Sequence, residues 1–279
     1  MFKLNKAQQE AVDYDPSKAM RISAGPGSGK TRVIVEKIKH MLDCDVKSIL
    51  AVTFTRKAAN EMGERLKDVN LSNVKIGTFH HICFLWLIRN FNFTIIDSKE
   101  QVQIIKNIKE EKQWCHDVKP ASILNAISNA VNNGTNKLEN GDWDMVYQEY
   151  VRRKKSSCYK DFDDLLIDGL KLIKSNPPYF QHILVDEFQD TNTIQYQIVK
   201  VLAKNNGGAV TVVGDLDQSI YGWRQADIRN LSRFNHDFNC KVVKLEKSYR
   251  SKQKVLNTCM DILGDAKTKD LVSKRENPL

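Results

Sequence analysis

The sequence lacks the features that mark secreted, zinc-binding and membrane proteins. Its six cysteines are scattered and form no C-x-x-C pair, which indicates reduced, intracellular thiols rather than disulfides or a zinc site. The N-terminal segment has no apolar stretch typical of a signal peptide. The longest apolar run, residues 82–88, is too short to span a bilayer. We therefore expect a cytoplasmic protein with no membrane partner.

Length and composition allow one large domain or two modest ones. The chain has 279 residues, of which 41% are hydrophobic and 28% are charged, as expected for a protein with a substantial core. Its formal net charge of +9 favours a polyanionic partner such as nucleic acid. A positive net charge that only keeps the protein soluble is the alternative explanation. The basic run 152–155 could contact nucleic-acid phosphates or simply face solvent, and the sequence favours neither.

A glycine-rich segment, residues 23–31 (SAGPGSGKT), lies between a predicted strand and a predicted helix. This is the context that a P-loop requires. Its glycines let the backbone aim N–H groups at phosphate oxygens, and the helix N-terminus adds its dipole. Lys30 would reach the β- and γ-phosphates, and the Thr31 hydroxyl would ligate magnesium. Ala24 stands where the strict P-loop pattern has its first glycine. The alternative interpretation of residues 23–31 is an ordinary glycine-rich turn before a helix.

The run ILVDEFQDTN, residues 183–192, supplies the partner that a P-loop needs. A short apolar strand would deliver Asp186 to hold Mg²⁺ and Glu187 to activate water beside a nucleotide's phosphates. Carboxylates clustered at a strand end make little sense as packing, because unpaired buried charges are costly. We therefore expect Lys30 and the Asp186–Glu187 pair to converge on one triphosphate, although 156 positions separate Lys30 from Asp186.

Strands alternate with helices along most of the chain, which predicts an α/β fold with a parallel sheet. The expected strands are 49–54, 74–77, 183–185, 210–213 and 242–245. Residues 90–165 show helical periodicity and no convincing strand, so we predict a helical insertion there. The predicted domains are therefore an ATPase domain from 1–89 and 166–279, and an insertion from 90–165. The tail beyond about residue 265 is polar, and we expect it to be mobile.

Further motifs point to one family. They are LNKAQQEAV (4–12), AVTFTRKAANEM (51–62), GTFHHI (77–82), VVGDLDQSIYGWRQAD (212–227) and LEKSYRS (245–251). In order, wording and spacing, these segments and DEFQDTN closely resemble the UvrD/Rep family of superfamily-one DNA helicases. The resemblance covers nearly the whole chain and is least clear over residues 95–160. It implies a RecA-like P-loop NTPase domain that uses ATP and Mg²⁺ and binds single-stranded DNA.

The resemblance also implies roles for particular residues. Gln8 would read the adenine edge, Tyr249 would lie against the base and Arg32 would lie along the nucleotide. Glu187 would be the catalytic base, Gln218 would sense the γ-phosphate and Arg250 would neutralise charge in the transition state. The predicted nucleotide-binding set is Gln8, Ala24, Gly25, Pro26, Gly27, Ser28, Gly29, Lys30, Thr31, Arg32 and Tyr249, with Thr31 and Asp186 as metal ligands.

DNA contacts are implied in the same way. Phe54, Tyr221 and Trp223 match family positions that stack on single-strand bases, and Thr55, Thr78 and His80 match positions near the DNA backbone. From the residues alone, Phe54 could belong to the core, Trp223 could anchor a loop and His80 could be structural.

The chain shows no counterpart of the family's second RecA-like lobe. Nothing after residue 251 resembles its motifs, so the chain is expected to be the ATP-binding N-terminal half. Three interpretations stay open. It could be a fragment of a 3′-to-5′ DNA helicase, one half of a split helicase completed by a second polypeptide, or an ATP- and DNA-binding interaction module without motor activity.

Overall fold

The chain forms two compact units in the computed structural model, which describes residues 3–219, 226–264 and 268–274. Unit 1 comprises Met1–Thr78, Pro177–Thr191 and Val199–Leu279, and unit 2 comprises Phe79–Asn176 and Asn192–Ile198. Unit 1 is therefore discontinuous, with unit 2 inserted into it. The domain boundaries that we derive from the sequence stay a prediction.

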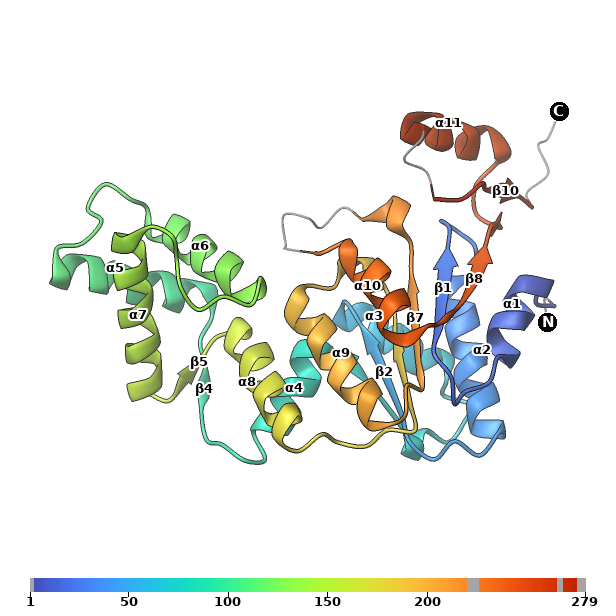
Figure 1. Ribbon diagram of the computed structural model, residues 1–279, viewed down its shortest axis with the longest axis horizontal. Helices are drawn as coiled ribbons and strands as arrows, with labels where there is room; N and C mark the ends of the chain where they lie inside the picture. The colour runs from blue at the N-terminus through green and yellow to red at the C-terminus, as the bar shows by residue number, and fades with distance from the viewer. Residues whose placement is uncertain (1–2, 220–225, 265–267, 275–279) are drawn as a thin grey trace. The chain divides into compact units, whose positions relative to one another are not determined.

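Unit 1 is built on a six-stranded sheet in the order β3-β2-β6-β7-β1-β8 (Figure 1). Every neighbouring pair in this sheet is parallel. The predicted α/β fold with a parallel sheet is thereby confirmed. The strands are β1 (Met20–Ala24), β2 (Ile49–Thr53), β3 (Val74–Thr78), β6 (His182–Val185), β7 (Val210–Gly214) and β8 (Lys241–Leu245).

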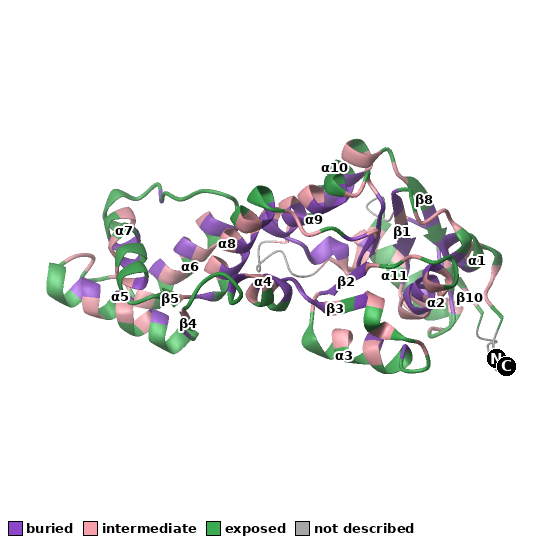
Figure 2. Cartoon of the chain, turned by 90° about the horizontal axis from the view of Figure 1, so that it is seen from below, coloured by how far each residue is buried: buried purple, intermediate pink, exposed green. Residues whose placement is uncertain are grey.

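Three helices and the sheet share one apolar core. The helices are α1 (Lys6–Asp13), α2 (Lys30–Asp43) and α3 (Arg56–Arg65). Their apolar side chains recur at helical spacing, so Val33, Ile34 and Ile38 of α2 are completely buried against strand residues such as Ile22 and Leu184. The central strands β2, β6 and β7 are buried along their whole length, as expected for parallel strands covered on both faces. Figure 2 shows the buried residues gathered along the strands.

The remaining elements of unit 1 follow the sheet strands. They are η1 (Leu71–Asn73), η2 (Phe188–Asp190), η3 (Leu216–Gln218), α10 (Arg229–Phe238), β9 (Lys247–Ser248), α11 (Gln253–Leu263) and β10 (Val272–Ser273). Phe188 of η2 packs edge-on against Phe234 of α10, with ring centroids 5.6 Å apart. This contact holds the turn after β6 against a buried aromatic side chain.

Unit 2 is mainly helical and contains a cluster of buried polar contacts. It contains α4 (Phe79–Leu87), α5 (Ser98–Lys112), α6 (Pro120–Asn132), α7 (Gly141–Ser156) and α8 (Phe162–Ser175), while α9 (Thr193–Asn205) begins in unit 2 and ends in unit 1. Lys154, whose side chain is 6% exposed, pairs with Asp161 at 2.6 Å and Asp164 at 2.5 Å. Asp161 also caps α8 through a capping box.

Two details of the structure differ from the sequence expectations. Residues 90–165 do contain strands, because β4 (Thr94–Ile95) and β5 (Tyr159–Lys160) pair in parallel; each has only two residues, too few for an alternating pattern to be visible. The polar tail is also structured over residues 268–274, where β10 pairs with β9. Among the described residues, no helix is long and apolar enough to cross a membrane.

Candidate nucleotide-binding site

The glycine-rich segment forms a tight loop between β1 and α2, as its sequence predicts. Gly27 and Gly29 have left-handed φ angles of 69° and 85°, which residues with a side chain rarely adopt. A Cβ atom on Gly27 would lie 2.4 Å from Cβ of Arg250. The loop therefore needs glycine both for its backbone conformation and for the close approach of the segment after β9.

The start of α2 is suited to an anion. Its N-cap is Gly29, which has no side chain to accept a hydrogen bond from the first N–H groups of the helix. Lys30 and Thr31 occupy the first turn, and Ser28 Oγ is buried with no hydrogen-bond partner among the described residues. A helix N-terminus with uncapped donors and a flanking lysine is a phosphate-binding arrangement.

Strand β6 delivers the predicted acids to the carboxyl edge of the sheet. Asp186 follows the strand directly, and its N–H donates to the carbonyl of Val52 on β2 at 2.8 Å. Its side chain is almost fully buried, and burial together with the neighbouring Glu187 raises the pKa of Asp186 to about 7, while Lys30 opposes the rise. Such a carboxyl group favours a nearby cation, because a cation stabilises its ionised form.

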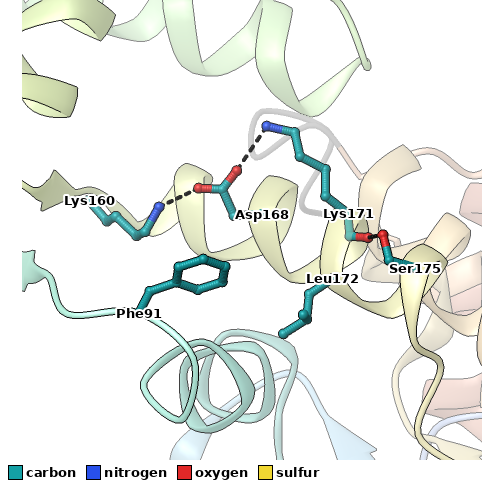
Figure 3. A pocket seen from close by; sticks show the side chains of 6 residues that line it. All are labelled: Phe91, Lys160, Asp168, Lys171, Leu172 and Ser175. Carbon is teal, nitrogen blue, oxygen red and sulfur yellow. Dashed lines mark hydrogen bonds and ion pairs between the residues drawn. The ribbon is translucent and has the colours of Figure 1, made fainter.

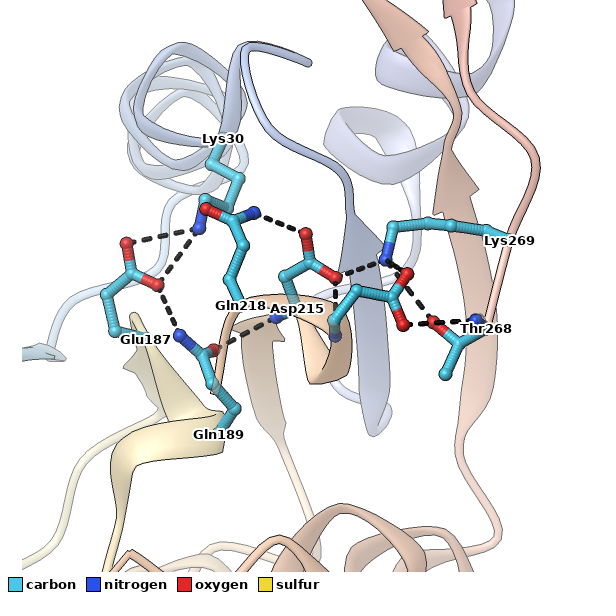
Figure 4. A network of polar contacts seen from close by, with 8 residues as sticks. Lys30, Glu187, Gln189, Asp215, Gln218, Thr268 and Lys269 are labelled. Carbon is cyan, nitrogen blue, oxygen red and sulfur yellow. Dashed lines mark hydrogen bonds and ion pairs between the residues drawn. The ribbon is translucent and has the colours of Figure 1, made fainter. Parts of the chain in front are cut away.

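Glu187 occupies a strained position next to this carboxyl group. Its φ of 50° lies in the left-handed region, which costs a non-glycine residue about 1–3 kcal/mol. With this left-handed backbone conformation, the side chain of Glu187 points toward the P-loop. Lys30 Nζ lies 2.9 Å from Oε2 and 3.1 Å from Oε1 of Glu187 (Figure 4). The structure thus brings the P-loop lysine and the acidic pair together, as expected from the two motifs.

A chain of hydrogen bonds continues from Glu187 toward the end of β7. Gln189 Nε2 donates to Glu187 Oε2 at 2.8 Å, and the N–H of Asp215 donates to Gln189 Oε1 at 2.9 Å. Gln218 Nε2 in turn donates to the Asp215 carboxylate. Gln218, the predicted γ-phosphate sensor, is therefore linked to Lys30 through Glu187, Gln189 and Asp215 (Figure 4). The link passes through the backbone N–H of Asp215 as well as through side chains. The motif sequences do not reveal the roles of Gln189 and Asp215, because both roles depend on contacts between segments that follow different strands.

The acidic cluster includes a third carboxyl group, that of Asp190, which accepts a hydrogen bond from Gln189 Nε2 through Oδ2 at 3.3 Å. Asp190 Oδ1 is buried and has no hydrogen-bond partner among the described residues. Burial and the nearby Glu187 raise the pKa of Asp190 to about 6. Two carboxyl groups with raised pKa values, one lysine and an uncapped helix N-terminus fit a magnesium–triphosphate complex, which supplies cation and anion together.

The predicted adenine-side residues surround the other side of the loop. Gln8 is 2% exposed, and its side chain accepts from Asn5 N at 3.0 Å and donates to Ser28 O at 2.9 Å. Tyr249 is 46% exposed, its N–H donates to Gly27 O at 2.9 Å and its hydroxyl accepts from Asn5 at 2.8 Å. Gln8 thus braces the P-loop and the N-terminus of α1, a function that the motif alone does not indicate.

The other predicted nucleotide residues lie in or near the P-loop, on α2 and after β9. Ala24 and Gly25 are buried at the end of β1, Pro26 accepts a hydrogen bond from Ser248 at 2.9 Å, Arg32 is half-buried on α2 and Arg250 is exposed after β9. Thr31 and Asp186, the predicted metal ligands, form no hydrogen bond with each other among the described residues.

The predicted DNA residues divide between the two units. Phe54 and Thr55 follow β2, and Thr78 ends β3 opposite Thr53, so these three lie at the same carboxyl edge as Asp186. Phe54 is half-buried and Thr55 caps α3 by accepting from Ala58 N at 3.1 Å.

In unit 2, burial lowers the pKa of His80 to about 4, and its ring packs edge-on against Phe162 with centroids 5.8 Å apart. His80 is therefore neutral at pH 7 and suited to hydrogen bonding rather than to charge pairing. Tyr221 and Trp223 lie outside the described residues.

A pocket in unit 2, with a volume of about 340 Å³, is lined by residues outside the motifs. Its lining includes Phe91, Lys160, Asp168 and Lys171 (Figure 3). Asp168 pairs with both lysines, at 2.9 Å for Lys171, and these pairs lower the pKa of its carboxyl group despite burial. The polar groups of this pocket satisfy one another.

Comparison with known sequences agrees with the geometry. A model of the UvrD/REP helicase N-terminal domain matches residues 4–239. The chain belongs to this family. It is 39% identical to the ATP-dependent DNA helicase PcrA of Bacillus subtilis (strain 168) over 93% of the chain, and 36% identical to the DNA helicase II of Haemophilus influenzae over 94%.

These matches cover 39% and 40% of the two relatives. The chain therefore spans about two fifths of the length of the curated UvrD/REP relatives that it matches. The matched family domain includes every predicted ATP-site residue except Tyr249 and Arg250.

Proposed function

We propose that the chain is the ATP-binding N-terminal part of a DNA helicase or translocase, which couples ATP hydrolysis to 3′-to-5′ movement on single-stranded DNA. The observation that carries this proposal is the Lys30–Glu187 contact at the mouth of the P-loop. Direction of movement is taken from the family alone. The ATPase domain comprises residues 1–89 and 166–279 in this proposal, and residues 90–165 are its insertion.

The site residues divide the chemistry of phosphoryl transfer among them. Lys30 and the first N–H groups of α2 hold the β- and γ-phosphates, and Thr31 and Asp186 hold Mg²⁺. Bound Mg²⁺ supplies charge neutralisation on the transferring phosphoryl group. Glu187 orients the attacking water and accepts its proton, and Gln218 senses the γ-phosphate. Arg250 neutralises transition-state charge, a role worth roughly 10³–10⁵ in rate in related enzymes.

The Lys30–Glu187 pair suggests how binding prepares the base. The Lys30 ammonium donates hydrogen bonds to both carboxylate oxygens of Glu187. A triphosphate offers stronger acceptors with more charge, so Lys30 exchanges its carboxylate partner for phosphate oxygens. Of its two hydrogen-bond donors, Lys30 and Gln189, Glu187 then keeps only Gln189. Its carboxylate becomes available to a water molecule. The same lysine thus keeps the base occupied until nucleotide is present.

Base and sugar contacts come from the adenine side of the loop. Gln8 has one amide hydrogen and one oxygen lone pair beyond its two observed hydrogen bonds, and these suit the adenine edge. Tyr249 is exposed enough to lie against the base, and Arg32 lies along the nucleotide.

Single-stranded DNA is the proposed second ligand. Phe54, Tyr221 and Trp223 stack on bases, each stack contributing roughly 1–3 kcal/mol. Thr55, Thr78 and His80 contact the DNA backbone. Support comes from Phe54 and Thr55, which follow the strand next to β6, and from Thr78, which ends the strand after that. The net charge of +9 is further support. We further propose a cytoplasmic location.

Rapid ATP hydrolysis requires a second domain that closes the nucleotide-binding cleft from the other side, as a second wall. In the family a second RecA-like lobe supplies it, either from the same chain or, in a split enzyme, from a second polypeptide. We propose that residues 1–279 alone bind ATP and hydrolyse it slowly.

The test is ATP hydrolysis with and without single-stranded DNA, measured for residues 1–279 alone and with the second lobe of a PcrA helicase supplied in trans. DNA-stimulated hydrolysis that requires the added lobe supports the proposal. Vigorous stimulation without it refutes the need for a second wall. Binding of ATP and DNA with no hydrolysis in any combination would identify an interaction module instead, and failure to bind ATP would refute the proposal as a whole.

A further inference from the structure

The segment 268–274 lies directly against the P-loop, although no motif marks it. Its strand β10 pairs with β9, and Leu271 is 7% exposed. A Cβ atom added to Gly25 would lie 2.4 Å from Leu271 Cδ2 and 3.3 Å from Lys269 Cε. The first glycine of the loop is therefore needed to admit this segment, and the two parts of the chain form one packed unit.

Lys269 is the polar centre of this contact. Its side chain is 0% exposed, and it pairs with the carboxylates of Asp215, 0% exposed, and Asp217, 9% exposed. The distance from Lys269 Nζ to Asp217 Oδ2 is 3.1 Å, and the N–H of Thr268 donates to Asp217 Oδ1 at 3.0 Å. One ammonium and two carboxylates leave a net charge of −1 in this buried space. The two carboxylates therefore depend on the single ammonium and on their hydrogen bonds to stay there.

The same carboxylate positions the predicted γ-phosphate sensor. Asp215 accepts from Lys269 with one oxygen and from Gln218 Nε2 with the other. Its backbone N–H is held by Gln189, which also binds Glu187. Gly214 permits this last contact, because a Cβ atom there would lie 2.7 Å from Gln189 Oε1. Figure 4 shows the unbroken series of contacts from Lys30 to Lys269.

We propose that Lys269 is a positioning residue of the nucleotide site, which acts through Asp215 to aim the amide of Gln218. Without the ammonium, Asp215 Oδ1 keeps only the weaker hydrogen bond from the N–H of Asp217, at 3.1 Å. The carboxylate is then less firmly fixed, and so is the acceptor of Gln218. Segment 268–274 therefore responds to the γ-phosphate, and its anchoring in turn sets how well the site distinguishes ATP from ADP. This inference rests on the proposed ATP-binding function.

The test is a double-mutant cycle on nucleotide discrimination, using Lys269→Met, Gln218→Leu and the double variant. For each protein, the ratio of the affinities for a non-hydrolysable ATP analogue and for ADP is measured with Mg²⁺. We expect Lys269→Met to lower this ratio about tenfold, the value of one charge-assisted hydrogen bond. Because Lys269 acts through Gln218, the double variant should match Gln218→Leu alone. Additive effects would overturn the proposal.

The matched control is Lys154→Met in unit 2. Lys154 is also a buried lysine that pairs with two aspartates, and its side chain is 6% exposed. Its replacement should lower thermal stability as Lys269→Met does, but leave the ATP-to-ADP affinity ratio unchanged. An equal fall of the ratio in both variants would mean that Lys269 is merely structural.

A measurement on the unaltered protein covers the case in which Lys269→Met does not fold. Coupling between two sites is reciprocal, so the ATP analogue should slow amide hydrogen exchange over residues 268–274 more than ADP does. Equal exchange with both nucleotides would overturn the proposal. If the chain binds neither nucleotide, the proposed function fails instead, and the two failures are thereby distinguished.

Discussion

Replacing Lys30 with methionine should separate nucleotide binding from folding. The side chain of Lys30 is 14% exposed and that of Glu187 is 34% exposed, so the ion pair is partly screened by solvent. Lys30 also lowers the pKa values of Asp186 and Asp190, against the effect of burial. Lys30→Met leaves three carboxyl groups without a cation, and we expect the phosphate-free protein to lose about 1–2 kcal/mol of unfolding free energy.

The loss of ATP affinity should be larger than the loss of stability. Each hydrogen bond between an ammonium and a phosphate oxygen contributes about 1.5–3 kcal/mol, and Lys30 can donate more than one. ATP binding to Lys30→Met does not require the Lys30–Glu187 ion pair to be broken, and this offsets part of the loss of binding free energy. However, Glu187 is then an uncompensated negative charge beside the triphosphate, so repulsion outweighs that saving. We expect ATP affinity to fall at least about 100-fold, or about 3 kcal/mol.

The assay is calorimetric titration with ATP and Mg²⁺, together with urea unfolding of the same samples. The control is Lys200→Met, since Lys200 pairs with Asp237 at 2.7 Å with comparable exposure of 27% and 19% and lies outside the nucleotide elements. Lys200→Met should lose similar stability and bind ATP normally. ATP affinity within threefold of the unaltered protein in Lys30→Met would refute the placement of the phosphates at Lys30.

Three further predictions follow from the structure. Burial lowers the pKa of His182 to about 4, so its stabilising effect is complete above pH 6.5 and is lost as pH falls toward 4. Replacing His182 with Gln should therefore reduce the loss of unfolding free energy between pH 7.5 and pH 5 by about 2 kcal/mol, as measured by urea unfolding at the two pH values, and an unchanged loss would contradict the role of His182. Gly27→Ala should abolish ATP binding, because its Cβ atom would collide with Arg250 in a left-handed backbone; circular dichroism checks that the fold survives, and normal ATP titration would contradict the clash. Affinity for single-stranded DNA should fall steeply with salt in fluorescence anisotropy, and a flat response would contradict a phosphate-tracking surface.

Strands and motif positions could be predicted from the sequence because they are local. The apolar run 49–54 becomes β2 (Ile49–Thr53), and the run 210–213 becomes β7 (Val210–Gly214). The P-loop and the DEFQD strand each carry their own chemistry in consecutive residues. Parallel sheets place strand ends at one edge, so the meeting of Lys30 with Glu187 could be inferred from two local patterns and one rule of topology.

The missed contacts depend on pairing between segments far apart in sequence. Lys269 looks like one more lysine in a polar tail, and only the buried carboxylates of Asp215 and Asp217, 54 and 52 positions away, explain its burial. Hydropathy treats a charged residue as exposed, so it fails wherever charges neutralise one another in the interior. The same error hides Lys154, which reads as part of a basic run but lies buried between two aspartates.

The order of strands suggests how one sheet would serve the two proposed ligands, ATP and single-stranded DNA. The P-loop strand β1 lies beside β7, which leads to Gln218, and β7 lies beside β6, which leads to Asp186 and Glu187. The next strands, β2 and β3, lead to the proposed DNA residues Phe54 and Thr78. Asp186 is bonded directly to β2, through its N–H and the Val52 carbonyl at 2.8 Å. If nucleotide binding displaces the turn that carries Asp186 and Glu187, the displacement would be transmitted directly from β6 to β2. Because β6 and β2 are hydrogen-bonded neighbours, it would reach the proposed DNA residue Phe54 without passing through other elements.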